Sequence, residues 1–404
     1  CDIYNIISPE NAGHKLGFKI MKNTYHPTQF ISFIISIKAV ICSLSYLAWS
    51  TLCFAEVNIY SDSGWSTSIS GSLPVFAVAS DHEGSESAFR VQSGFNPANI
   101  NFHIIAPTTE SGLTISGHIQ VDSHLNAPNG LQNGGMFESR VANIQILGDF
   151  GIVTLGKDFG VFNSNAIGDI ASQSGVGWLG SDADAGNATG GRIGTGYVYA
   201  NFNPQIKFTS NDIDGFVLKV AIINPEEPQD ASVQTSLPRF EGQITYFTDG
   251  FKVWAGAFQQ KISVQGEHIF DYSMEGFDVG AHLQADKFGL TLNFTDTTGI
   301  GADGVYGGSI NDFDVDATQW YIEADYKTNK SRFGVSYGEG SQDPRAADIE
   351  KDLKTVPEVK NKLTMLFLHY YLSEQFRIIS ELQHYQSDIQ NNYKAVILGF
   401  QFDF

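Results

Sequence analysis

The sequence predicts an all-β chain that folds as a transmembrane antiparallel β-barrel of about sixteen strands. Beyond residue 55, segments of about ten residues in which apolar and polar side chains alternate recur to the end of the chain. No stretch beyond that point is apolar for long enough to span a bilayer as a helix. The connections between these segments alternate between short turns and long polar loops. Short turns on one rim and long loops on the other are typical of outer-membrane barrels.

The segment 318–328 shows the alternation most clearly. Trp320 and Tyr326 lie on one face of the expected strand, and Glu323 and Asp325 lie on the other. This division fits a strand between lipid and a water-filled lumen. A half-exposed strand of a soluble protein would look the same, so the prediction rests on the repetition along the chain.

The connections define the expected strands. Short connections carry Asp, Asn or Gly residues that suit tight hairpins, and they lie at 149–151, 212–215, 248–250, 286–289, 329–331 and 373–374. Long polar connections lie at 125–137, 159–190, 224–237, 263–273, 300–316 and 343–360. The expected strands are 65–80, 88–106, 113–124, 138–148, 152–158, 191–210, 216–223, 239–248, 251–262, 274–285, 290–299, 318–328, 332–342, 361–372, 375–388 and 393–404. About fourteen or eighteen strands remain alternatives, because boundaries read from sequence are uncertain by several residues.

The last expected strand carries the most specific signal. One of its faces carries Val396, Leu398, Phe400, Phe402 and Phe404. Such an edge strand would promote aggregation in a soluble protein, whereas in a membrane barrel it meets lipid and closure removes the edge. A chain that ends on Phe after alternating aromatics resembles the insertion signal of outer-membrane barrels, with Phe400, Phe402 and Phe404 as its residues. A soluble sandwich with a Phe-rich last strand is the alternative.

Residues 1–55 are interpreted as an N-terminal extension and a cleaved signal peptide, with Met21 as a candidate start. The apolar run 30–55 is interrupted once, at Lys38, and ends in Cys-Phe-Ala, which places small residues at the two positions that specify cleavage. A membrane-anchor helix is the alternative, because the run is long enough to cross a bilayer. Removal of this segment leaves residues 56–404, or 404 − 55 = 349 residues, as one barrel domain.

The chain is acidic, with a formal net charge of −20. Residues 1–55 hold four Lys against Asp2 and Glu10, a net charge of +2, so the mature chain carries −20 − 2 = −22. Such acidity argues against nucleic acid or an anionic lipid surface as a partner. All three Cys residues precede residue 56, so the mature chain would contain no disulfide.

Four local motifs carry a family resemblance. The segments 88–94, 139–157, 158–161 and 191–199 match, in that order, a second strand, a strand-turn-strand unit ending in Gly-Lys, the start of a long third loop and the strand that leaves that loop. In these motifs, and in the rhythm of turns and loops over most of residues 56–404, the chain resembles the Gram-negative general porins. The resemblance implies a trimeric, sixteen-stranded diffusion channel whose third loop, about 159–190, folds into the lumen.

The resemblance also implies a pore constriction in which loop carboxylates face wall arginines. The candidates are Asp169, Asp182 and Asp184 on the loop and Arg90, Arg140 and Arg192 on the wall. Opposite charges across a narrow channel would order water and orient dipolar solutes.

Two features depart from the family pattern. Arg140 shares its parity with Ala142 and Ile144, so simple alternation aims it outward unless a β-bulge intervenes. The family's Pro-Glu-Phe-Gly-Gly stretch is missing from the third loop, where Ser-Gln-Ser-Gly-Val-Gly-Trp stands at 172–178. The constriction is therefore expected to be wider, or less basic, than in the family.

We therefore expect an outer-membrane porin that admits small hydrophilic solutes and ions by passive diffusion. The alternatives are a substrate-selective channel for carboxylates or sugars and, from other classes, an outer-membrane adhesin or barrel enzyme. No Ser/His or Asp/His pair near a rim indicates a hydrolase, and the ten His residues show no metal-ligand spacing, so we expect no catalytic residue and no cofactor.

The expected partners follow from the same interpretation. They are two further copies in a homotrimer, outer-membrane lipid and lipopolysaccharide, the barrel assembly machinery and small hydrophilic solutes, with no nucleic acid. The acidic segments 182–187 and 312–316 could hold Ca²⁺ or Mg²⁺ weakly, and solvated acidic loops are the alternative. The residues leave the solute, the exclusion size and the ion preference open.

Overall fold

The computed structural model describes residues 56–404, with gaps at 85, 95, 124, 126–136, 172–190, 228–232, 235–236, 266–268, 307–309 and 390. These residues belong to one compact unit, Ser50–Phe404. Residues 1–55, with the expected signal peptide, lie outside the described residues. Within the described part, no helix has the length and apolar character needed to cross a membrane.

Nearly all regular structure is β-strand. The strands are β1 Val57–Asp62, β2 Trp65–His82, β3 Ala88–Gln92, β4 Ala98–Ile105, β5 Thr114–Ser123, β6 Phe137–Glu138, β7 Ala142–Gly148, β8 Gly151–Phe159, β9 Phe202–Thr209, β10 Phe216–Ile223, β11 Val233–Gln234, β12 Arg239–Thr248, β13 Phe251–Val264, β14 Phe270–Ala285, β15 Phe288–Thr298, β16 Asp316–Lys327, β17 Ser331–Gln342, β18 Val359–Tyr371, β19 Phe376–Ser387 and β20 Tyr393–Asp403. The 3-10 turns η3 Ile310–Asp312 and η4 Ile349–Lys351 accompany them.

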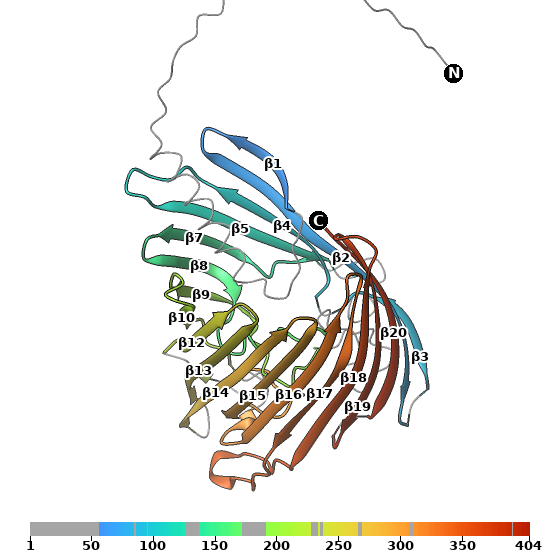
Figure 1. The fold of residues 1–404 in the computed structure, drawn as a ribbon. Coiled ribbons are helices and arrows are strands. Elements are labelled where there is room, and N and C mark those ends of the chain that lie inside the picture. Colours follow the sequence, from blue (N-terminus) through green and yellow to red (C-terminus); the bar gives the residue numbers. More distant parts are fainter. Residues whose placement is uncertain are drawn as a thin grey trace, which may run out of the picture. The chain divides into compact units, whose positions relative to one another are not determined.

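The strands form a closed antiparallel barrel (Figure 1). The last strand, β20, pairs with β2 from Ser72↔Asp403 to His82↔Tyr393, which closes the sheet. Three short strands, β3, β6 and β11, share the partner strands of β4, β7 and β12 and add no place to the ring. The extra strand β1 pairs only with β2. Of the twenty strands among the described residues, 20 − 4 = 16 therefore make the ring, which confirms the predicted strand number.

Several strand boundaries differ from the sequence prediction, most of them by a few residues. Strand β1 lies before the first expected strand. The expected strand 88–106 is interrupted between β3 and β4 at a segment that ends with Pro97, which has no backbone N–H to donate. The expected strand 191–210 begins only at Phe202, because Gly194 and Asn201 adopt positive φ angles of 74° and 57° that end the extended conformation.

The barrel exposes apolar side chains on its outer face and buries the alternate positions. In β20, Val396, Leu398, Phe400 and Phe402 are exposed, and the intervening Gln401 and Asp403 are buried. Strand β16 repeats the pattern, with Trp320 and Ile322 exposed and Glu323 buried. The alternation predicted from the sequence is therefore present, with polar residues toward the lumen.

The short turns have the backbone conformation that their sequence predicts. Asp214 and Gly215, between β9 and β10, both have positive φ angles, 53° and 88°. A two-residue hairpin turn that follows the twist of the strands requires this conformation at both central positions, and Asp-Gly adopts it readily.

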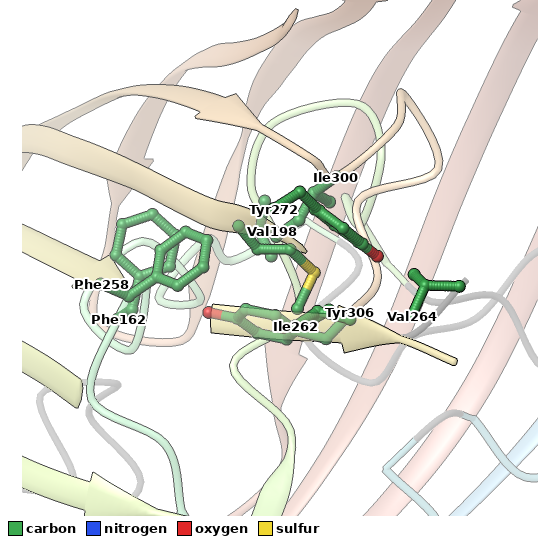
Figure 2. Packing of buried hydrophobic residues seen from close by; sticks show 9 residues of the cluster. Phe162, Val198, Phe258, Ile262, Val264, Tyr272, Ile300 and Tyr306 are labelled. Atoms are coloured by element: carbon green, nitrogen blue, oxygen red, sulfur yellow. The ribbon is translucent and has the colours of Figure 1, made fainter. Parts of the chain in front are cut away.

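Two long loops pack against the inner side of the wall. We call them L3, residues 160–201, and L6, residues 299–315. Figure 2 shows Phe162 and Val198 of L3 together with Ile300 and Tyr306 of L6 against side chains of β13 and β14. The rings of Phe162 and Phe258 lie 4.7 Å apart between their centroids. The apolar core thus joins the inward loops to the barrel wall.

Candidate functional site

The first limb of L3 is bound by a carboxylate that projects from the wall. Glu241 of β12 is buried, and its Oε2 atom accepts hydrogen bonds from the backbone N–H groups of Val161 and Phe162 at 2.6 and 2.8 Å. Its Oε1 atom lies 2.9 Å from Nε of Arg239. Hydrogen bonds in which one partner is charged are about twice as strong as neutral ones. Glu241 therefore fixes the point where L3 leaves the sheet and turns inward.

Amide side chains extend this attachment along β12 and β15. Asn165 Nδ2 donates to Gln243 Oε1 at 2.7 Å and to Thr245 Oγ1 at 2.8 Å. Asn163, whose φ angle is 59°, accepts at Oδ1 from the Val198 N–H at 2.7 Å and from Thr295 Oγ1 at 3.0 Å. Asn163 thereby links both limbs of L3 to the wall.

A second wall carboxylate holds the loop further along. Glu323 of β16 accepts from the Ile170 N–H at Oε1, at 2.7 Å, and from the Ala171 N–H at Oε2, at 3.0 Å. Ile170 and Ala171 also pack in a buried cluster with side chains of β18, β19 and β20. The described part of L3 therefore follows the inner wall from β12 to β20.

The return limb of L3 is held by Arg192. Its side chain has an exposed fraction of 0%, and Nη2 donates to Ser336 Oγ at 2.6 Å while Nη1 donates to the Leu363 carbonyl at 3.3 Å. Its Nε atom lies 3.8 Å from Oδ2 of Asp169. Arg192 was expected to line the pore constriction from the wall, but its guanidinium is buried between L3 and the wall, where it anchors the loop.

Asp169, the loop carboxylate of the predicted constriction, is buried beside Arg192 and does not face it across water. Its exposed fraction is 2%, and its Oδ1 atom accepts from Tyr197 Oη at 3.2 Å. Burial, together with the charge of Asp169, raises the pKa of Tyr197 well above its ordinary value, so the phenol keeps its proton and donates. The two residues that were expected to oppose each other across the channel form one buried ion pair.

Arg90 lies on the lumen side of β3, as its parity predicts. It pairs with Val78 of β2, which is buried, whereas its neighbour Phe89 is the outward residue, with an exposed fraction of 70%. Arg90 itself is partly exposed. Of the candidate arginines, it is the one whose side chain the lumen solution reaches most.

Arg140 is directed inward by a β-bulge. In β5, Asp122 pairs with Glu138 and Ile119 pairs with Ala142. The two residues of β5 between these pairs, 120–121, therefore lie opposite three residues, 139–141, of the neighbouring strand. The extra residue reverses the alternation. Arg140 consequently shares the lumen side with Glu138, and its Nε atom lies 2.6 Å from Glu138 Oε1.

The remaining predicted residues divide into two groups. Asp182 and Asp184 lie outside the described residues. Phe400 and Phe402 lie on the outer face, and Phe404 closes the barrel through backbone hydrogen bonds with Gly71, from Gly71 N at 2.6 Å and to Gly71 O at 2.9 Å. Their role as an assembly signal stays a prediction.

The sequence analysis did not identify the two carboxylates that hold L3, although alternation placed Glu323 on the lumen side. It also missed Gly334-Val-Ser336-Tyr-Gly338, which formally matches the Gly-x-Ser-x-Gly pattern of hydrolases. Ser336 lies within β17, buried beneath Arg192, and not on the exposed strand-to-helix turn that a nucleophile requires. In the described residues, no group of three or more His, Cys, Asp or Glu is arranged to hold a metal ion.

A protein-family model described as Gram-negative porin matches residues 43–390, well over half of the chain. No relative among the curated proteins matches the chain. Among solved structures, the outer membrane channel DcaP of Acinetobacter baumannii is 14% identical with a TM-score of 0.65, and the match covers 86% of this chain and 100% of that one. An anion-selective porin from Comamonas acidovorans is 14% identical with a TM-score of 0.63, covering 84% and 100%. OmpT, an outer membrane protein of Vibrio cholerae described in a trimer form, is 12% identical with a TM-score of 0.55, covering 84% and 100%. At these identities, the structures show the shared fold alone.

Proposed function

This chain belongs to the Gram-negative porin family, and from that premise we propose that L3 sets the width and the ion preference of its channel. As a porin, the chain forms a water-filled channel of the bacterial outer membrane for passive diffusion of small hydrophilic solutes. Family and fold indicate a channel rather than an enzyme.

One observation carries the proposal about L3. Two lumen-facing carboxylates, Glu241 and Glu323, bind four backbone N–H groups of the loop. A loop bound at both of these positions, with Arg192 holding its return limb, narrows the lumen without depending on contacts among its own residues. L3 is therefore a fixed constriction.

The proposed ion preference is a weak one for cations. Within the described lumen, Arg192, Arg239 and Lys207 each lie in an ion pair with a carboxylate, so their charges largely cancel. The acidic surplus of the mature chain lies mostly on loops and rims, where salt screens it within about 8 Å at physiological ionic strength. The preference should therefore be visible at low salt and fade as salt rises.

We further propose that the chain works as a homotrimer. The outward residues of the early strands are large and apolar, as Phe89 of β3, Ile119 of β5 and Ile144 of β7 show. Barrels of related fold include one described in a trimer form. Packing these faces against further copies would remove them from lipid and fix the relative position of three channels.

The test is recording from the refolded protein in planar bilayers. A trimer of open channels should give conductance in groups of three equal steps, with a small reversal potential of cationic sign in a KCl gradient at low salt. That reversal potential should shrink when both solutions are raised to molar salt. Absence of conductance would overturn the channel proposal, single unlinked steps would overturn the trimer, and an anionic sign would overturn the selectivity.

A further inference from the structure

Three lysines lie on the lumen side of one part of the wall, and we call them the lysine track: Lys207 of β9, Lys219 of the neighbouring β10 and Lys252 of β13, which β12 separates from β10. Lys219 lies between the buried Val217 and Ala221, while the outward Leu218 and Val220 are exposed. Lys252 likewise shares the lumen side with the buried Trp254. None of the three belongs to the arginine positions that the family resemblance implies.

The strand registers place the track along the direction of diffusion. Lys207 pairs with Ala221, so Lys219 is its diagonal neighbour, two residues closer to the turn between β9 and β10. Lys252 is the second residue of β13, directly after the turn at Asp249. The track therefore descends from the loop side of the barrel toward its short-turn rim.

Among the described residues, the first member of the track has a partner, and the other two lie outside any ion pair. Lys207 Nζ lies 2.6 Å from Asp158 Oδ2. Across the part of the chain that the structure describes, no carboxylate oxygen lies within 4.0 Å of the Nζ atom of Lys219 or Lys252. Both side chains are partly exposed, and each interacts electrostatically with the lysine above it in the track.

This arrangement differs from that of several other basic side chains that face the lumen. Arg140, Arg239 and Arg332 each have a carboxylate within 3 Å. Lys219 and Lys252 are instead two like charges on the inner wall, and in a narrow lumen with low-dielectric walls a single charge acts more strongly than in bulk water. A mobile anion in the lumen would supply the missing countercharge.

We propose that Lys219 and Lys252 bind small anions that carry two negative charges on oxygen atoms, such as hydrogen phosphate or a short dicarboxylate. The contact of the Lys252 ammonium with the Trp254 ring, 5.4 Å from its centroid, keeps that ammonium close to the wall. Such an anion would contact Lys219 first and Lys252 next on its way to the short-turn rim. The inference rests on the proposed function, because it requires an open lumen, and it adds a local anion site to a channel whose overall ion preference is weakly cationic.

The test is single-channel recording in KCl at constant ionic strength, with phosphate in one series and succinate in the other. We expect either anion to reduce the wild-type current and to saturate. In the double variant Lys219→Gln/Lys252→Gln, the half-blocking concentration should rise by about tenfold or more. Block by only one of the two anions would assign the site to that anion.

Two controls make the result decisive. Lys261→Gln changes an exposed lysine on the outer face of the same strand, β13, and should leave block unchanged. The double variant Lys219→Arg/Lys252→Arg keeps both charges and should keep the block, which separates loss of charge from a folding defect. Absence of saturable block in the wild type, or equal block in the Gln variant, would overturn the anion site while the KCl conductance still stands.

Discussion

The attachment of L3 to Glu323 predicts a measurable change when one oxygen of that carboxylate is replaced. In wild type, the two oxygens accept from the Ile170 and Ala171 N–H groups at 2.7 and 3.0 Å. Glu323→Gln keeps the size of the side chain but exchanges one acceptor for an NH₂ donor. One of the two N–H groups, of Ile170 or of Ala171, would then point at the NH₂ group and remain buried without an acceptor. The hydrogen bond to the remaining oxygen would also lose the contribution of the negative charge.

The size of the effect follows from these two bonds. A hydrogen bond to a charged group contributes about 1.5–3 kcal/mol, and a buried donor without a partner costs about 1–3 kcal/mol. Loss of one bond should therefore weaken the attachment of this part of L3 by roughly 1.5–3 kcal/mol. Because 1.4 kcal/mol corresponds to a factor of ten, the detached population of the loop should rise about 10- to 100-fold.

Two assays read this change. Amide hydrogen exchange at Ile170 and Ala171 should speed up by the same factor, since exchange reports the open population. Single-channel records should show a noisier current, because a loop that detaches changes the constriction. The matched control is Glu339→Gln in β17, a carboxylate on the outer side of the barrel. Wild-type exchange rates at Ile170 and Ala171 in the Glu323 variant would refute the claim that this carboxylate holds the loop.

Two further predictions concern the return limb and the end of the chain. Arg192→Ala should leave Asp169 buried without its cation, at a cost of about 3–5 kcal/mol, so we expect a lower unfolding temperature and a larger conductance; unchanged values of both would contradict the anchoring role. Deletion of Phe404 removes the backbone bonds to Gly71 and should lower the yield of the heat-modifiable folded form in outer membranes with little change in synthesis. A normal yield would show that the last residue is dispensable for insertion.

The sequence was sufficient to predict the barrel because its signal is repeated and local. Alternation fixes which face of β16 and β20 meets lipid, and Asp-Gly at 214–215 fixes a hairpin, without any knowledge of distant residues. The pattern of any single strand is weak evidence for a membrane barrel. Sixteen successive strands, joined by short and long connections in alternation, are compatible with few other folds. The same local reasoning placed Arg90 on the lumen side.

The details that the sequence could not supply depend on contacts between distant segments. The bulge at 139–141 follows from how two strands pair, and single-strand alternation consequently aimed Arg140 outward. The strand expected from residue 191 begins only at Phe202, because the residues before Phe202 belong to the loop L3. Alternation also shows that a side chain faces the lumen, but it does not show whether a loop covers that side chain.

That last distinction separates anchoring residues from pore-lining residues in this barrel. Glu241 and Glu323 would both line the channel if L3 were absent, and in the structure they are covered by the backbone that they bind. Lys219 and Lys252 occupy equivalent lumen-facing positions and are not covered. A charged residue on the inner wall can therefore either position the constriction or contact the solute, and the path of L3 decides which. For this chain, the path of L3 gives Glu241 and Glu323 the first role, and we propose the second role for Lys219 and Lys252.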